Sequence, residues 1–276
     1  MTLGEGEFLL ARLIAEVQTR LGLRLQPAVK GLVADAAKGL VQSGESPSLA
    51  ALYQRVQTFD PNDAAVRALV AAASVKETSF YRAPLQLQAL EKHLVESVLP
   101  VLRRRGERQW RFWSAGCSTG EEGYTLALMA RKIDPRFRLQ VVGTDMNERS
   151  LELARTGCYG ARSLRAIPAE LLAQHFTPTE KGYQIHEELR AGVTFHRHNF
   201  VQDPLPNVEL GLMNLDLIVC RNVLIYVDPA HLHGLWKRFR ATLRPGGSLL
   251  VSATEYAIAA AAEGFQDLGN GLLVRS

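Results

Sequence analysis

The chain has 276 residues, of which 47% are hydrophobic and 22% charged, a globular composition that excludes a disordered or fibrous protein. Lys and Arg number 32 against 28 Asp and Glu, and a net charge of +4 neither requires nor excludes a nucleic-acid partner. Three scattered cysteines and the lack of any apolar run of about 18 to 20 residues favour a reduced, cytoplasmic protein without a membrane-spanning segment.

The first part of the sequence predicts helices only. Apolar residues from Phe8 to Leu21 recur three and four positions apart, which places one stripe of a helix against a core. A second helix is expected to open at residues 47–48. A third is expected near residues 60–63, with Asp60 as its cap and Asp63 at the positive end of the helix dipole.

After Trp110 the hydrophobic period changes, and short apolar runs alternate with helical stretches. Predicted strands are residues 111–116, 139–144, 215–219 and 248–252, and predicted helices are residues 121–133, 147–155 and 229–243. A polar segment with hairpin-like alternation is expected at residues 176–200. This alternation predicts an α/β fold, with a mostly parallel sheet that is covered on both faces.

The first strand runs into a glycine-rich turn, residues 115–122, with the sequence AGCSTGEE. Such a turn allows a ligand close to the backbone, and the next helix offers free N–H groups at the carboxyl edge of the sheet. The spacing differs from the dinucleotide fingerprint and lacks the P-loop lysine, while Glu121 and Glu122 suit a ligand that carries a cation. The alternative is an ordinary structural turn between strand and helix.

The second strand ends in Asp145, a carboxylate that can bind both hydroxyls of a ribose. Asp145 can equally cap the following helix. Together, the glycine turn and the strand-end acid predict a nucleoside ligand without a phosphate chain, and S-adenosylmethionine (SAM) is the common one.

A further polar group follows the strand at residues 215–219, where residues 220–226 read CRNVLIY. Enzymes that methylate base amino groups or glutamine amides often carry an Asn-Pro-Pro-aromatic motif at this point. The chain lacks that motif, which is evidence against base or amide N-methylation.

Four motifs make the chain similar to the CheR family of chemotaxis receptor methyltransferases. They are ETSFYR at residues 77–82, WSAGCSTGEE at 113–122, CRNVLIY at 220–226 and LRPGG at 243–247. The resemblance implies a Rossmann-like class I SAM methyltransferase sheet with an all-helical N-terminal domain and a small inserted β-subdomain. The implied domains are residues 1–73 and 74–276, with the β-subdomain at about 160–195.

The resemblance implies methyl transfer from SAM to glutamate side chains of a chemoreceptor, giving a glutamyl methyl ester and S-adenosylhomocysteine. The implied partners are the cytoplasmic helices of the receptor, with no nucleic acid, no membrane insertion and no metal. Arg82 and Tyr226 are the implied catalytic residues. The implied cofactor-binding residues are Lys76, Thr78, Arg82, Gly116, Glu122, Asp145, Asn199, Phe200, Cys220 and Arg221, with Asn199 and Phe200 ending a strand over residues 193–200.

Some positions depart from the family pattern and leave alternatives open. Lys76 stands where the family commonly has Asn, Gly123 replaces a usual Pro, and residues 252–255 read SATE where the family has Gly-His-Ser-Glu. Arg82 can instead be a structural bridge, and Tyr226 a core residue. A methyltransferase that acts on another protein or a small molecule, and a catalytically weak SAM-binding signalling protein, are the alternative functions.

Overall fold

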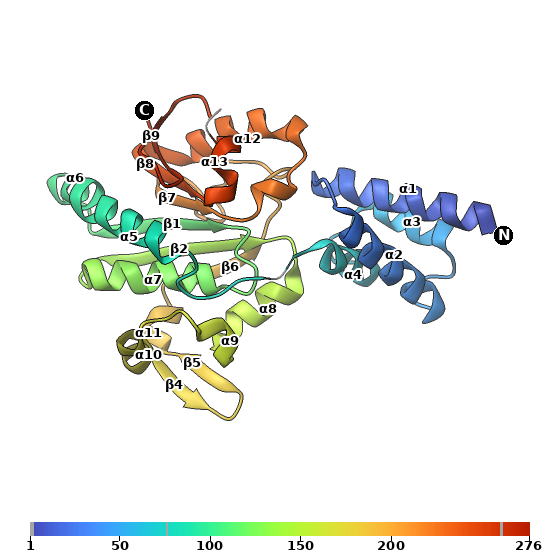
Figure 1. Ribbon diagram of the computed structural model, residues 1–276, viewed down its shortest axis with the longest axis horizontal. Coiled ribbons are helices and arrows are strands. Elements are labelled where there is room, and N and C mark those ends of the chain that lie inside the picture. The colour runs from blue at the N-terminus through green and yellow to red at the C-terminus, as the bar shows by residue number, and fades with distance from the viewer. Residues whose placement is uncertain (1–2, 76, 260–261) are drawn as a thin grey trace.

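The structure is a computed structural model that describes residues 3–75, 77–259 and 262–276. Four N-terminal helices form one end of an elongated molecule, and a sheet covered by helices forms the other (Figure 1). A small second sheet projects from the sheet end. The predicted α/β fold with a helical N-terminal part and an inserted β-subdomain is confirmed.

Local capping residues mark the starts of α3 and α4, and the cap of α4 differs from the predicted one. The helices are α1 (Leu3–Leu21), α2 (Pro27–Gln42), α3 (Leu49–Thr58) and α4 (Ala64–Ala73). The Ser48 hydroxyl caps α3, and the Asp63 carboxylate caps α4 by accepting from the N–H groups of Ala65 and Val66. The prediction that Asp60 is the cap of α4 is wrong, because its carboxylate accepts from Asn62 in the preceding turn.

The four helices bury the stripe that the sequence predicts, except at its start. Leu13, Val17 and Leu21 are at most 1% exposed, and α1 contacts both α2 and α3. Phe8 is 63% exposed, because the first turns of α1 extend past the helices that cover the rest of it (Figure 1). Its ring lies beside the Arg12 guanidinium instead, 5.8 Å from the ring centre.

The large sheet has seven strands in the order β6-β2-β1-β7-β8-β10-β9. Its strands are β1 (Gln109–Ala115), β2 (Arg138–Asp145), β6 (Val193–Arg197), β7 (Leu215–Cys220), β8 (Leu243–Val251), β9 (Phe265–Asp267) and β10 (Leu272–Arg275). The first five strands of that order are parallel, and β10 and β9 add an antiparallel edge. Parallel strands bring their carboxyl ends to one edge, so the turns after β1, β2 and β7 are neighbours.

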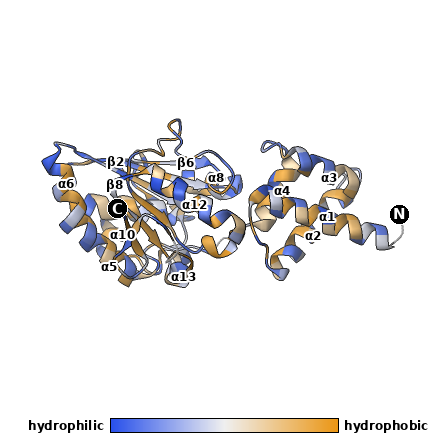
Figure 2. Cartoon of the chain, turned by 90° about the horizontal axis from the view of Figure 1, so that it is seen from above, coloured by the Kyte–Doolittle hydropathy of each residue, from blue (hydrophilic) through white to orange (hydrophobic). Residues whose placement is uncertain are grey.

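Helices cover both faces of this sheet, and alternate strand residues pack against different helices. One face, with Phe112 and Leu217, lies under α7 (Glu121–Ile133) and the chain from α5 to α6; the other, with Trp113 and Ile218, lies under α12 (Pro229–Thr242). The other helices on the first face are α5 (Pro84–His93), the π-helix η1 (Leu94–Val98), α6 (Leu99–Arg104) and α8 (Glu148–Thr156). Figure 2 shows apolar colour through the sheet and hydrophilic colour at the end of α6.

The small sheet has three antiparallel strands in the order β3-β5-β4. Its elements are β3 (Cys158–Tyr159), α9 (Ala161–Leu164), α10 (Ala169–His175), β4 (Phe176–Thr179), β5 (Gly182–Ile185) and α11 (Glu187–Arg190). The hairpin predicted over residues 176–200 is therefore limited to β4 and β5. The prediction that the next strand extends to Phe200 is also wrong, because β6 ends at Arg197 and the chain then turns.

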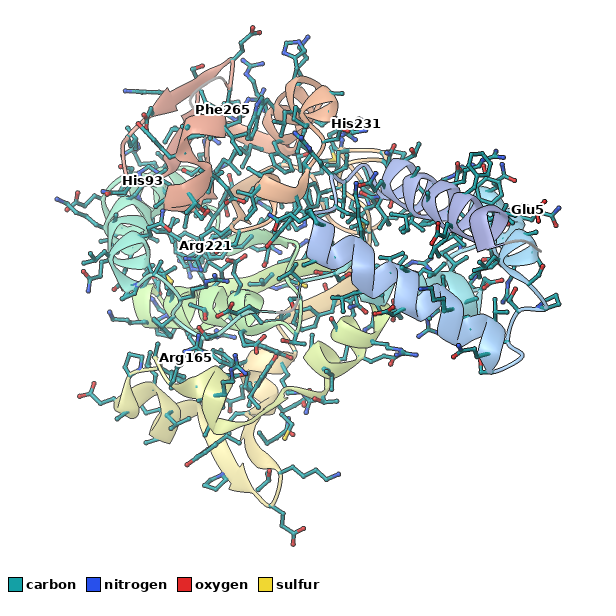
Figure 3. All side chains as sticks on the ribbon, turned by 45° about the vertical axis from the view of Figure 1, so that its right-hand side comes forward. Glu5, His93, Arg165, Arg221, His231 and Phe265 are labelled. Atoms are coloured by element: carbon teal, nitrogen blue, oxygen red, sulfur yellow. The ribbon has the colours of Figure 1, made fainter. Side chains whose placement is uncertain are left out.

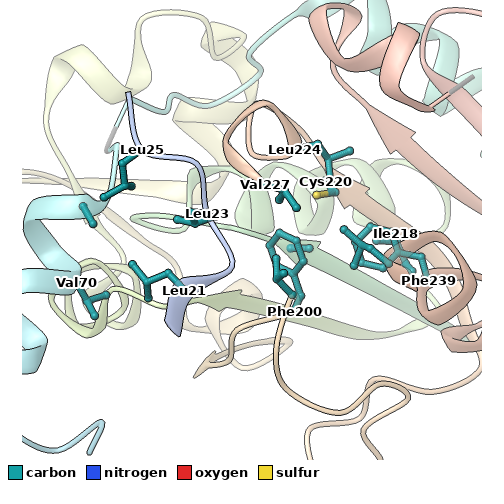
Figure 4. Close-up of a cluster of buried hydrophobic side chains, with 14 of the residues drawn as sticks. Leu21, Leu23, Leu25, Val70, Phe200, Ile218, Cys220, Leu224, Val227 and Phe239 are labelled. Atoms are coloured by element: carbon teal, nitrogen blue, oxygen red, sulfur yellow. The ribbon is translucent and has the colours of Figure 1, made fainter. Parts of the chain in front are cut away.

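The helical end and the sheet end are joined by packing and by backbone hydrogen bonds. Leu23 forms a β-bridge with Val227, and the Arg24 N–H donates to the Tyr226 carbonyl over 2.7 Å. Figure 4 shows Leu21, Leu23 and Leu25 from the helical end near Phe200 and Val227 of the sheet end. One core cluster includes residues from both ends. Among the described residues, no helix combines the length and apolar character needed to cross a membrane.

Candidate active site

A cavity lies where the carboxyl edge of the sheet meets the helical end. Its walls come from the turns after β1, β2, β6 and β7, from the segment that follows α4, and from the α1–α2 loop. It gathers most of the predicted site residues, namely Thr78, Arg82, Gly116, Glu122, Asp145, Asn199, Phe200, Arg221 and Tyr226. Three of the four sequence motifs, which lie far apart in the chain, therefore meet in one place, whereas LRPGG at residues 243–247 starts β8 and does not line the cavity.

The turn after β1 is held against the end of β2. The N–H groups of Gly116 and Cys117 both donate to the Thr144 carbonyl, over 2.8 and 2.9 Å. Gly116 has φ of +78°, and a Cβ atom there would lie 2.6 Å from Cγ2 of Val223. Both facts require glycine, so the turn can approach the loop after β7 closely.

Asp145 ends β2, and its carboxylate is held by backbone N–H groups. One oxygen accepts from Asn147 and the other from Ser118, each over 2.9 Å. Burial raises the pKa of Asp145, although these two hydrogen bonds act in the opposite direction. Asp145 is therefore not the cap of α8, whose N-cap is Asn147; it holds the turn before α8 and lines the cavity, with one lone pair left on each oxygen.

The two acids at the start of α7 have different surroundings. Glu122 accepts from the Ser114 hydroxyl over 2.8 Å and from Nε of Arg221 over 2.8 Å, in a largely buried ion pair. Glu121 does not line the cavity, and its carboxylate accepts from Thr119 and Ser163 instead. Of the pair that the sequence offers to a cationic ligand, only Glu122 is placed to meet it.

Arg221 links this ion pair to the first motif. Its guanidinium donates to the Arg82 carbonyl over 2.7 Å, and the residue is only 8% exposed. Figure 3 shows Arg221 inside the sheet end of the molecule. Arg221 therefore fixes the backbone at Arg82 without using the Arg82 side chain, whose guanidinium stays available for other hydrogen bonds.

Arg82 lines the cavity with an incompletely used guanidinium. It donates to the Glu77 carbonyl over 2.8 Å, and within residues 3–75, 77–259 and 262–276 it forms no ion pair. The backbone around it is anchored, since the Phe80 N–H donates to the Ser163 carbonyl and the Tyr81 N–H to the Thr125 hydroxyl. A positioned arginine with free donors suits a carboxylate.

Asn199 and Phe200 line the cavity from the turn after β6. The Asn199 side-chain amide donates to the Leu21 carbonyl over 3.1 Å, and its oxygen accepts from the Val201 N–H. Asn199 therefore ties the helical end to the cavity, while Phe200 supplies a buried apolar wall.

The loop after β7 supplies Tyr226 but not the side chain of Cys220. Tyr226 is half-buried, and no hydrogen-bond partner of its hydroxyl is found in the described part of the chain. Cys220 is fully buried and does not line the cavity, because side chains alternate along β7 and it shares the face of Ile218 in the core (Figure 4). Lys76 lies outside the described residues.

Ser118 is a cavity residue that sequence reasoning missed. Its hydroxyl is buried and has no hydrogen-bond partner among the residues that the structure describes, and Ser118 lines the cavity. A buried hydroxyl of this kind is costly unless a ligand or water satisfies it. The signal was available, since Ser118 lies inside the glycine turn. The wall from the helical end, Leu23, Leu25, Gln26 and Val29, has no local sequence signal.

A wider hollow of about 970 Å³ adjoins the cavity and shares Leu23, Met146 and Asn199 with it. Two arginines in its walls have acidic partners, Arg20 with Glu16 and Arg67 with Glu152, each over 2.8 Å. The smaller cavity holds the predicted site residues and the Ser118 hydroxyl, and it is therefore the candidate site.

The cavity residues fit SAM. A strand-end carboxylate suits the ribose, apolar walls suit the adenine, and Glu122 offers a carboxylate to the cationic amino-acid end. A largely parallel seven-stranded sheet with this site at its carboxyl edge defines a Rossmann-like class I SAM methyltransferase.

Comparison with known proteins identifies the family. The family model described as CheR methyltransferase, SAM binding domain, matches residues 76–269. A chemotaxis protein methyltransferase of Listeria monocytogenes is 32% identical over 75% of this chain and 75% of its own length. Another, of Borreliella burgdorferi, is 26% identical over 89% of this chain and 87% of its own. The chain therefore belongs to the CheR methyltransferase family and is a SAM-dependent enzyme.

A further relative bears a different name. The probable biofilm formation methyltransferase WspC of Pseudomonas aeruginosa is 32% identical over 74% of this chain, which corresponds to 47% of the WspC length. Similarity to this chain therefore extends beyond proteins named for chemotaxis.

Proposed function

We propose that the chain transfers the methyl group of SAM to glutamate side chains on the cytoplasmic helices of a chemoreceptor-like protein. The products are a glutamyl methyl ester and S-adenosylhomocysteine. The observation that supports an acidic acceptor is Arg82, a cavity arginine that has free donors and no acidic partner among the described residues. The names of the chemotaxis relatives support the choice of a receptor.

Bound SAM supplies an electrophilic methyl group on its sulfonium sulfur. A glutamate with an ordinary pKa of about 4.3 is already ionised at neutral pH, so the chain needs no general base. Its residues have to hold the carboxylate in line, and fixing two reactants together lowers a barrier by about 7–11 kcal/mol. Arg82 holds one carboxylate oxygen and leaves the other to react. Tyr226 shapes the slot beside it.

We propose cofactor roles for the residues that line the cavity. Asp145 binds the ribose hydroxyls, Phe200 packs against the adenine, and Glu122 faces the amino-acid end. Thr78, Gly116, Asn199 and Arg221 complete the walls. Lys76 keeps a proposed role on sequence grounds alone. Cys220 is left out, because its side chain lies in the core.

We also propose a division of the chain into residues 1–73 and 74–276, acting in the cytoplasm. The helical part closes the cavity through Leu23 and Leu25, which supports a role in excluding water from the reacting groups. The β-subdomain at about residues 160–195 is tied to the first motif by ring contact of Phe80 with Tyr159 and Phe176.

The test uses the purified chain, SAM labelled in its methyl group, and membranes that contain chemoreceptors. The expected result is label on the receptor that alkali releases as methanol, and that is absent when the receptor's acceptor glutamates are replaced by alanine. Alkali-stable label would show N-methylation and contradict the ester. Binding of S-adenosylhomocysteine without transfer to any receptor would support a catalytically weak signalling protein instead.

A second candidate keeps the chemistry and changes the receptor. The similarity to WspC, named a probable biofilm formation methyltransferase, supports a receptor whose output is biofilm formation rather than motility. Methylation rates measured side by side on receptors of both kinds separate the two, since the true acceptor should react with the larger kcat/KM.

A further inference from the structure

Glu255 lies at the end of the 3-10 helix η3 (Ala253–Glu255), directly after β8. Its side chain is fully buried, yet it does not line the cavity. A buried carboxylate is costly unless hydrogen bonds replace the water it loses. The partners of Glu255 therefore show what the burial of this charge achieves.

Backbone N–H groups of the loop after β7 supply most of those partners. The Glu255 carboxylate accepts from Asn222, Val223 and Leu224 over 2.7, 2.6 and 2.7 Å, and more weakly from Ile225 over 3.4 Å. The N–H and hydroxyl of Ser252 donate to it over 3.0 and 2.5 Å. One side chain thus accepts hydrogen bonds from four successive N–H groups of a loop whose residues belong to no strand or α-helix.

This loop forms part of the cavity wall. Asn222, Val223 and Tyr226 all line the cavity, and Asn222 has φ of +60°, a conformation that needs support from its surroundings. From the opposite side, the Arg24 N–H donates to the Tyr226 carbonyl. The loop is therefore held between Glu255 and the α1–α2 loop, and Glu255 supplies the larger number of hydrogen bonds.

We propose that Glu255 is a positioning residue for methyl transfer: through the backbone of residues 222–225 it sets where Tyr226 and Val223 lie against the reacting groups. It touches neither cofactor nor acceptor. The inference rests on the proposed function for the reaction, but the geometry it describes is independent of the acceptor. Because a displacement of about 1 Å at a reacting centre can lower a rate by roughly 100-fold, a loosened loop should lower turnover.

The test compares Glu255→Gln with Glu263→Gln, an exposed glutamate in the same C-terminal part of the chain. The amide keeps the size of Glu255 but turns an NH₂ group toward the N–H donors. For Glu255→Gln we expect kcat about 10- to 100-fold lower, and affinity for S-adenosylhomocysteine within about threefold of the original. Hydrogen exchange at residues 222–226 should be at least about tenfold faster. Glu255→Asp, which keeps the charge, should recover part of the rate.

Two results would overturn the proposal. One is unchanged hydrogen exchange at residues 222–226 in Glu255→Gln. The other is loss of kcat only in step with cofactor affinity and melting temperature, which would indicate a merely structural role. Should Glu255→Gln fail to fold, Ser252→Ala removes one donor and should raise the same exchange rates; unchanged rates there would also overturn it. The exchange measurement needs no acceptor, so it remains valid if the proposed function fails.

Discussion

Both edges of the large sheet hold a buried ion pair, which is Glu122–Arg221 at the carboxyl edge, but their remaining charged groups have different partners. At the amino edge, Asp134 is held by the guanidinium groups of Arg103 and Arg136, each over 2.8–2.9 Å, and Asp216 lies 2.9 Å from Arg244. At the carboxyl edge, Asp145 and Glu255 are held by backbone N–H groups, and Arg82 forms no ion pair among the described residues.

This difference separates charged groups that stabilise the fold from charged groups that can still bind a ligand. At the amino edge, Arg103 and Arg136 satisfy the Asp134 carboxylate, and the buried Asp216–Arg244 pair does not line the cavity. At the carboxyl edge, Asp145 and the free donors of Arg82 keep capacity for a partner, whereas the hydrogen bonds of Glu255 go to the loop after β7 and to Ser252. Substitutions at the carboxyl edge should therefore change binding or rate, whereas substitutions at the amino edge should change stability.

The largest expected effect is that of Arg82→Ala. Loss of the guanidinium removes the group that orients the acceptor carboxylate, so kcat should fall by about 10²–10³-fold while calorimetry shows affinity for S-adenosylhomocysteine largely intact. Arg104→Ala, an exposed arginine near the amino edge, is the matched control and should change neither quantity. Equal loss of rate and affinity in Arg82→Ala would instead assign Arg82 to cofactor binding.

Asp145→Ala should act on binding. Removal of a carboxylate that accepts from ribose hydroxyls costs about 1.5–3 kcal/mol, which corresponds to roughly 10- to 100-fold weaker binding of S-adenosylhomocysteine by calorimetry. Asp145→Asn, which keeps one oxygen acceptor, should lose less. An unchanged dissociation constant in Asp145→Ala would remove the proposed ribose role and leave only the hydrogen bonds to the backbone of Ser118 and Asn147.

Asp134→Asn should act on stability instead, lowering Tm by about 2–4 °C at neutral pH, with kcat unchanged. Hydrogen bonds from Arg136 and Arg103 hold the pKa of Asp134 well below its usual range. A lowered pKa in the folded state means that the stabilisation exists above the ordinary pKa of about 3.9 and is lost as the pH falls below it. The Tm difference between variant and parent should therefore shrink below about pH 4. A difference that stays constant with pH would contradict the ion-pair explanation.

The smallest effect should be that of Ser118→Ala. If the unpartnered hydroxyl serves the cofactor, its loss should weaken binding of S-adenosylhomocysteine by about threefold, or ~0.7 kcal/mol, and leave Tm unchanged. Ser163→Ala is a useful comparison, since that hydroxyl already donates to Glu121 and should affect Tm rather than affinity. Tighter binding in Ser118→Ala would show that the hydroxyl has no ligand partner.

Local patterns predicted the parts of this fold that local physics decides. The strand-to-helix alternation after Trp110, the helix start at residues 47–48 and the glycine turn at Gly116 each follow from residues close in sequence. The prediction for Asp60 failed because Asp63, three positions further, competes for the same role and also pairs with Arg55.

Several residues of the site could be predicted from the sequence, but not which side chains point away from the cavity or which residues cover it. Arg82 and Tyr226 could be named because motifs carry them, and Asp145 because it ends a predicted strand. No local pattern shows that Cys220 lies on the core face of β7, that Glu121 turns toward Ser163, or that Leu23 covers the cavity. These outcomes depend on strand register and on how the two ends of the molecule pack, and both are tertiary properties.

The bridge between Leu23 and Val227 has a consequence for how this chain can evolve. Two short stretches about 200 positions apart pack together and exchange backbone hydrogen bonds. A change of backbone length or conformation in one stretch therefore requires a matching change in the other. An insertion in the loop at residues 22–26 would have to be matched by a change near residues 226–228. Grafting the helical part of one relative onto the sheet of another should therefore succeed only when both stretches are taken from the same parent.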